Sequence, residues 1–148
     1  MIELRRVDDP AVHVYLARDA RFDLGGARFD AGVELEHSDE SEDEVPRKIS
    51  IRLASLEWTG APATLAADGP QVFGQADSTQ PRAFVYSGFH HARVRVRFRV
   101  VALDGGDLTA DLHVDTDDVM RYDEAATRTI ITGPLTLRRG QRDSFWHP

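Results

Sequence analysis

Hydrophobic and polar residues alternate along most of the chain with a period of two. In the stretch 90–101, HHARVRVRFRVV, arginine takes every second position from 93 to 99 and apolar residues lie between. This period places successive side chains on opposite faces of a β-strand. Apolar stripes with the 3.6-residue period of an amphipathic helix are not found over any useful length. The pattern therefore predicts an all-β protein.

The alternating segments predict seven to nine strands, and their turn signals are typical of an antiparallel β-sandwich or an open barrel. The length of 148 residues is usual for one domain, so we expect a single domain over 1–148. Within 47–58 the alternation changes phase between Leu53 and Leu56, which predicts a β-bulge. The predicted strands span 2–7, 12–17, 20–24, 27–37, 47–58, 83–91 with the arginine-rich strand after it, 107–115 and 128–139.

One long stretch, 59–82, breaks the alternation and is rich in glycine, proline and alanine. It predicts one long irregular loop. In a compact domain a loop of this length is functional, locally folded or mobile.

A hairpin is predicted where DGGD (104–107) joins the arginine-rich strand to 107–115. A two-residue turn would set Arg99 opposite Leu112, and so bury charge or expose apolar side chains on both strands. We therefore expect a three-residue loop, or a four-residue loop whose register is displaced by one step. In the three-residue register, the arginines at 93, 95, 97 and 99 face Asp117, Asp115, His113 and Asp111.

The charge of the chain argues against a nucleic-acid partner. The net charge is −7, which repels DNA and RNA, and carboxylates are expected opposite the arginine row. Phe98, the one aromatic residue within the row, points to the other face, so a stacking platform for single strands is missing. The positive charge comes from seventeen arginines and the single Lys48. This bias is typical of a GC-rich coding genome, and we expect a bacterial or phage source.

Composition also bears on localisation. There is no apolar run near the ~20 residues that span a bilayer, and MIELRRVDDP lacks the apolar run of a secretory signal. The chain has no cysteine, hence no disulfide framework and no thiolate metal site. We expect a cytoplasmic protein that does not bind membranes.

Motifs for catalysis are missing, including the serine nucleophile elbow and the phosphate-binding loop. We therefore expect a protein that is not an enzyme and has no cofactor. A zinc site built from His90, His91 and His113 is not expected. Adjacent histidines on a strand point to opposite faces, and Arg97 would oppose a cation beside His113.

The acidic stretch 114–124 contains a weak calcium motif. Asp115, Asp117 and Asp123 have the spacing D-x-D-x5-D, which is similar to the third calcium loop of C2 domains. Carboxylate oxygens from a loop are the ligands that Ca²⁺ prefers. The pattern of the other C2 calcium loop has no counterpart in the chain. The resemblance implies a β-sandwich and, as one alternative function, a Ca²⁺-dependent binding module.

Two further features suggest a protein-binding surface. An acidic run fills 39–44, and an aromatic pair lies near the C-terminal end of the sequence. An acidic segment steers association with a basic cleft. The predicted partner-binding residues are Asp39, Glu40, Glu42, Asp43, Glu44, Phe145 and Trp146.

In its size, acidity and lack of cysteine, the chain resembles the immunity proteins of bacterial toxin systems. That resemblance implies an inhibitor that covers the basic active site of a cytoplasm-acting toxin with its acidic loop. The alternative is a structural subunit of a phage virion or a contractile injection apparatus, in which the loop 59–82 and the aromatic pair would lock neighbouring copies. The oligomeric state stays open.

Overall fold

The computed structural model describes residues 1–38, 45–58, 60, 63–69, 82–88, 91, 93–117 and 128–141. This part of the chain is all-β, as predicted, with nine strands and no helix, and therefore with no helix able to cross a membrane. The strands are β1 (Ile2–Arg6), β2 (Val12–Gly25), β3 (Arg28–His37), β4 (Lys48–Glu57), β5 (Thr64–Asp68), β6 (Ala83–Tyr86), β7 (Val94–Asp104), β8 (Asp107–Thr116) and β9 (Thr129–Arg139).

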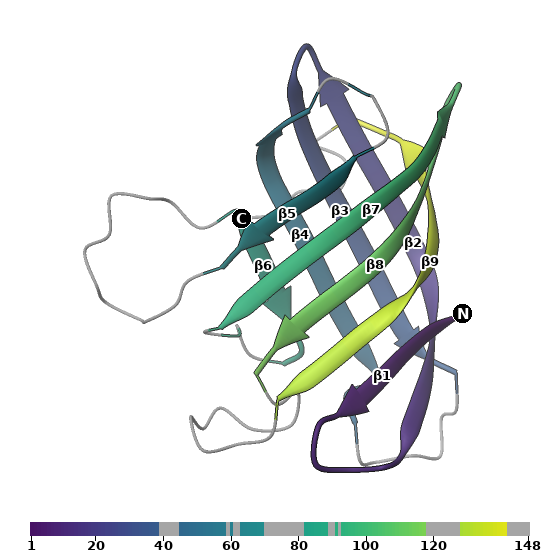
Figure 1. Ribbon diagram of the computed structural model, residues 1–148. Coiled ribbons are helices and arrows are strands. Elements are labelled where there is room, and N and C mark those ends of the chain that lie inside the picture. The colour runs from purple at the N-terminus through teal and green to yellow at the C-terminus, as the bar shows by residue number, and fades with distance from the viewer. Residues whose placement is uncertain are drawn as a thin grey trace, which may run out of the picture.

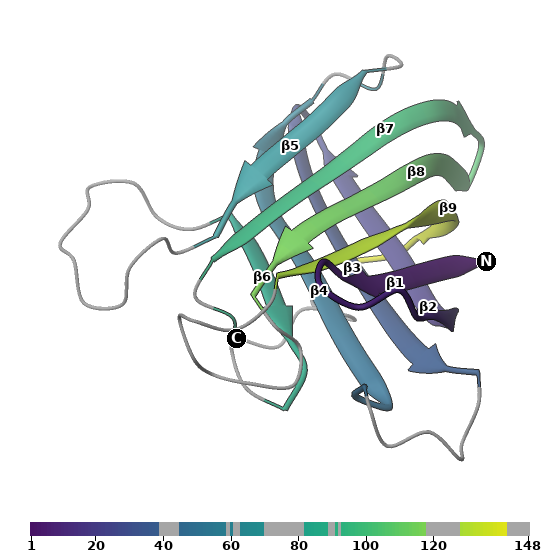
Figure 2. The same ribbon diagram turned by 60° about the horizontal axis from the view of Figure 1, so that its bottom comes forward.

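The strands form one sheet in the order β5-β7-β8-β9-β1-β2-β3-β4-β6, in which neighbours are antiparallel. The sheet folds over so that β5, β7, β8, β9 and β1 lie across β2, β3, β4 and β6 (Figures 1 and 2). The two edges of the sheet approach where the amide of Arg82 donates to the carbonyl oxygen of Asp68, at 3.3 Å. The result is a barrel-like sandwich that is nearly closed.

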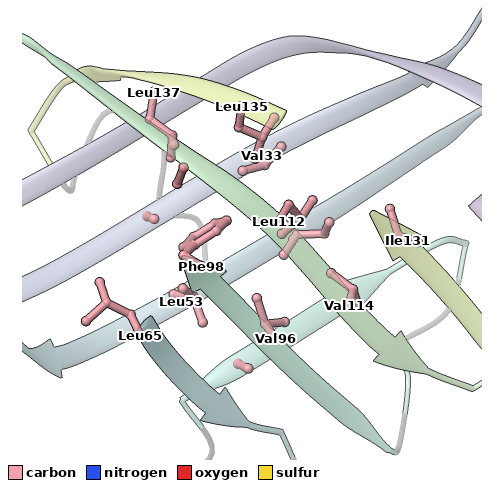
Figure 3. Close-up of a cluster of buried hydrophobic side chains, with 14 of the residues drawn as sticks. Val33, Leu53, Leu65, Val96, Phe98, Leu112, Val114, Ile131, Leu135 and Leu137 are labelled. Carbon is pink, nitrogen blue, oxygen red and sulfur yellow. The ribbon is translucent and has the colours of Figure 1, made fainter. Parts of the chain in front are cut away.

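The hydrophobic core fills the space between the two layers. Along β7, Val94, Val96, Phe98 and Val100 are buried, and the arginines between them are exposed. Figure 3 shows Phe98 among residues of both layers, with Val33 and Leu53 from one layer and Leu112 from the other. The period of two in the sequence is thus the inward and outward alternation of the strands, because apolar burial is the main driving force for packing the layers.

The predicted strands 12–17 and 20–24 are one long strand, β2, and their separation was wrong. The register of β2 against β3 shifts between Ala17 and Asp19, so a bulge lies at this point. The bulge moves the inward positions from Tyr15 to Phe22, that is from odd to even numbers. In the sequence this change of phase looks like the end of one strand and the start of another.

The bulge predicted in 47–58 is confirmed. Phe29 pairs with Leu56 and Ala31 with Leu53, so β4 carries one extra residue here. Ser55 adopts a positive φ of 54°, and its amide donates to Oδ1 of the buried Asp30 at 3.0 Å. The bulge takes the amide of Ser55 out of the regular strand pairing, and the buried carboxylate accepts its hydrogen bond instead.

The stretch 59–82 is not irregular throughout, because it contains β5. Leu65 and Ala67 are buried and alternate with exposed Thr64, Ala66 and Asp68, and the strand pairs with β7. The prediction of one long irregular loop is therefore corrected here. Alanine gives a weak hydrophobic signal, which hides a short alternating strand within an alanine-rich segment.

The hairpin of β7 and β8 has the predicted three-residue-loop register but not the predicted turn. Arg99 pairs with Asp111, Arg97 with His113 and Arg95 with Asp115. The turn nevertheless has two residues, since Asp104 pairs with Asp107 and only glycines lie between them. A bulge between Val100 and Ala102 supplies the extra residue that we expected in the loop. One extra residue in the strand therefore gives the same inward and outward register as one extra residue in the loop.

Candidate functional site

Four connections of the chain attach to the same end of the barrel, which we call the β3–β4 end. They are 7–11, 38–47, 87–93 and 117–128. The strand ends from which they start are aligned by four pairings, Tyr15–His37, Arg5–Val12, Ser50–Tyr86 and Thr116–Thr129. This end is the lower one in Figure 1. The hairpin turns of β2–β3 and β7–β8 lie at the opposite end, which we call the β7–β8 end.

The connections of the β3–β4 end account for the entire net charge of the chain. They contain eleven acidic residues and four arginines, a net charge of −7, which equals the net charge of all 148 residues. The rest of the chain has fourteen acidic and fourteen basic residues and is neutral. The excess negative charge of the chain is thus contained in connections that attach to one end of the barrel.

The acidic run predicted to bind a partner belongs to these connections. Asp39, Glu40, Glu42, Asp43 and Glu44 lie outside the described residues, but the residues on both sides of them are well anchored. The amide of Ser38 donates to the carbonyl oxygen of Val14 at 3.0 Å, and the Tyr15 hydroxyl donates to that of Pro46. Val45 is buried in the core. The barrel therefore holds both attachment points of the acidic run in place.

A buried aromatic cluster supports this anchor. His13, Tyr15 and His37 point inward from β2 and β3, and all three are buried. The His37 ring lies 5.0 Å from that of Tyr15, edge to face, and 5.8 Å from that of His13. Such edge-to-face contacts favour one fixed arrangement of rings. The sequence pattern did not reveal this cluster, since histidine at an inward position carries no hydrophobic signal.

A second polar network lies inside the same end. Nε2 of His91 is 2.6 Å from the Ser87 hydroxyl, and Nδ1 is 2.7 Å from the Thr116 hydroxyl. A hydroxyl beside an imidazole is also the arrangement of a nucleophile and its base. Here, however, all three residues are buried, and a neutral hydroxyl takes the place of the carboxylate that stabilises an imidazolium. The network instead fastens the connection after β6 to the end of β8.

The histidines considered for zinc are not brought together. His91 is buried and uses both ring nitrogens in the network above, whereas His113 is paired with Arg97 on the outward face of β8. His90 lies outside the described residues. Within the described ranges, no three histidine, aspartate or glutamate side chains are grouped so that they could hold a metal ion.

The two described calcium candidates already accept hydrogen bonds. Oδ1 of Asp115 accepts from the Arg128 guanidinium at 2.6 Å, and Oδ2 of Asp117 accepts from the backbone amide of Arg93 at 3.1 Å. Asp123, the third residue of the motif, lies outside the described residues. A cation at this site would have to compete with Arg128 for Asp115. The geometry thus offers no support for the C2-like alternative.

The arginine row is largely compensated. Arg99 pairs with Asp111, as expected from the register, but Arg95 forms its ion pair with Asp68 of β5, at 3.0 Å, rather than with Asp115. The strand β5 was not predicted, and so this partner could not be. Carboxylates on both neighbouring strands therefore lie beside the row and reduce its positive potential.

Sequence reasoning missed one surface feature of this end. Val12, Val14 and Leu16 lie on the outward face of β2, opposite in direction to the buried His13 and Tyr15. The signal was present in VHVYL, where apolar residues occur on both faces of a strand. We call the three outward residues the β2 stripe.

The predicted aromatic contacts Phe145 and Trp146 lie outside the described residues, so their prediction stays open. The site that can be built from the described residues is the β3–β4 end. It combines anchored attachment points for the acidic connections with the β2 stripe. No family model, curated protein or solved structure significantly matches the chain.

Proposed function

We propose that the protein is a non-enzymatic binding domain that blocks a basic protein partner, as an immunity protein blocks a cytoplasm-acting toxin. The observation that carries this proposal is the attachment of the whole net charge of −7 to the β3–β4 end. The acidic run 39–44 supplies five of the eleven acids there. In this account the acidic connections lie over the basic active site of the partner.

Electrostatic attraction would act mainly on the rate of association. A concentrated negative surface orients a basic partner before contact and raises the association rate by ~10–10³-fold. The effect is screened beyond ~8 Å at physiological ionic strength. Binding should therefore weaken steeply as salt is added.

The charge distribution favours a different protein over a second copy of the same chain. A structural subunit that uses its acidic end for assembly needs a basic surface on its neighbour. Outside the β3–β4 end the chain is neutral, and several of its described arginines form ion pairs, such as Arg52–Glu34 and Arg18–Glu36. The alternative of a virion or injection-apparatus subunit therefore receives less support.

The test compares two variants with equal changes in charge. One carries Glu42→Gln, Asp43→Asn and Glu44→Gln in the acidic run. The control carries Glu57→Gln, Asp104→Asn and Asp107→Asn, which are exposed and belong to the β7–β8 end. The binding partner is the protein encoded beside this gene, and the readouts are its association rate and its inhibition.

We expect the acidic-run variant to associate at least about tenfold more slowly at low salt, and the control to keep the wild-type rate. Equal rates for the two variants would contradict the role of the acidic run. A neighbouring protein that is neither bound nor inhibited would contradict the immunity-type function itself.

A further inference from the structure

The β2 stripe reverses the usual arrangement of a strand at the surface of a barrel. The outward Val12 and Leu16 are 48% and 39% exposed, and Val14 between them is half-buried. The inward residues of the same segment are His13 and Tyr15, which are buried. A strand with one face on the core normally places its polar residues outward. The outward apolar residues therefore lack an explanation in the fold.

The stripe lies directly beside the attachment point of the acidic run. The amide of Ser38, the last described residue before that run, donates to the carbonyl oxygen of Val14. Charged side chains flank the stripe within the sheet. Glu3 pairs with Val14 and Arg5 with Val12, and Glu36, which pairs with Leu16, forms an ion pair with Arg18.

The connection from β1 to β2 carries another exposed apolar residue at the same end of the barrel. Val7 is 60% exposed and precedes Asp8 and Asp9 in the connection to Val12. Apolar side chains thus lie among acidic ones on adjacent parts of the β3–β4 end. An apolar centre with a charged rim is the usual anatomy of a protein interface.

We propose that the β2 stripe, together with Val7, is the apolar centre of the surface that binds the basic partner. The partner then presents apolar side chains set between lysines or arginines, so that burial of the stripe adds to the attraction between charges. This inference rests on the proposed function, and it adds the kind of surface that the partner offers. Burial of apolar area slows dissociation, whereas the acidic rim speeds association.

Charge complementarity selects this occupant over a second copy of the chain. Two copies that met through their stripes would bring together two ends whose connections each carry a net charge of −7. Juxtaposed like charges across an interface oppose association. A partner with basic residues around its apolar ones gains from the same rim.

The test uses two short fluorescent peptides of equal length and charge. In one, lysine alternates with leucine, and in the other, lysine alternates with serine. The proteins are the wild type, a Val12→Ser/Leu16→Ser variant, and a Val101→Ser control. Val101 is 52% exposed at the bulge near the β7–β8 hairpin turn, away from the stripe. Circular dichroism verifies that all three proteins are folded, and sedimentation velocity reports their association state.

We expect both peptides to bind the wild type, and the leucine peptide to bind about tenfold more tightly. The stripe variant should lose this margin and keep its affinity for the serine peptide, and the Val101→Ser control should keep both. Equal affinity of the wild type for the two peptides, or an unchanged margin in the stripe variant, would overturn the inference but leave the proposed function standing.

Two other outcomes have different meanings. If neither peptide binds the wild type, the electrostatic basis of the proposed function fails, and the inference fails with it. If the wild type self-associates and the stripe variant is monomeric, a second copy occupies the stripe and the inference is overturned.

Discussion

At Gly133 the backbone of β9 passes too close to β1 for any side chain. Its φ is 154°, and a Cβ atom there would lie 2.5 Å from the carbonyl oxygen of Met1. We expect Gly133→Ala to lower the free energy of unfolding by about 2 kcal/mol, because the new methyl group forces β1 away from β9. Urea denaturation measures the change. Gly106→Ala is the control, since a Cβ atom there meets no atom within 4 Å. Equal stability of the two variants would show that β1 adjusts without cost.

The Thr116 hydroxyl matters because it is the described hydrogen-bond partner of Nδ1 of the buried His91. Thr116→Val keeps the shape and removes the hydroxyl, so Nδ1 of His91 loses this hydrogen bond. The expected loss of stability is about 1–3 kcal/mol. Thr109→Val, at an exposed position of the same strand, should change the stability by less than ~0.5 kcal/mol. Thermal denaturation of both variants measures the difference between their losses of stability. Equal losses would show that a water molecule replaces the lost hydroxyl.

At the scale of elements, the bulge at Val101 can be removed without changing the register of the hairpin. Val100 pairs with Ala110 and Ala102 pairs with Thr109, so Val101 is the extra residue. Deletion of Val101 should leave a regular hairpin that still pairs Arg99 with Asp111. Deletion of Arg97 removes a residue from the regular part of β7. On one side of the deletion, the inward side chains should then point outward and the outward ones inward. Backbone NOEs across the hairpin distinguish the two results, and a shifted pairing in the first variant would contradict this account.

The ion pairs of the arginine row set register more than stability. The side chains of Arg99 and Asp111 are 70% and 42% exposed, so water screens their attraction. A double-mutant cycle with Arg99→Ala and Asp111→Ala should therefore give a coupling of only ~0.2–1 kcal/mol. A coupling well above this range would mean that the row also contributes substantially to stability.

Strand periodicity carried most of the information that the sequence contained about the elements. The fold class, the bulge in β4 and the register of β7 on β8 could be predicted because each depends on which residues face inward. The bulge at Arg18 could not, since a change of phase and a break between strands look alike. β5 was hidden by the weak signal of its alanines.

The candidate site needed the strand order as well as the sequence. The acidic run was evident in the sequence, but its grouping with the connections 7–11 and 117–128 follows from the pairing of β1, β8 and β9. The position of the β2 stripe beside the acidic run follows from the hydrogen bond between Ser38 and Val14. Long-range pairings of this kind depend on the whole chain and leave no local pattern.

At the scale of the whole molecule, a neutral barrel carries its excess negative charge in connections that attach to one end. Two properties follow from this separation of charge. For the proposed basic partner, we expect association to be oriented before contact and to depend strongly on salt. We expect both properties to concern the β3–β4 end and not the β7–β8 end.

The central claim is therefore tested most directly by mapping where a polycation binds. Oligolysine is titrated into the ¹⁵N-labelled protein at low salt, and amide chemical shifts are followed. We predict that the largest changes among the described residues occur beside the acidic connections, at Asp8, Ser38, Val45 and Asp117, and that added salt reverses them. Changes of equal size at Arg97 and Arg99 and at Asp104 and Asp107, or no saturable change at all, would contradict the account.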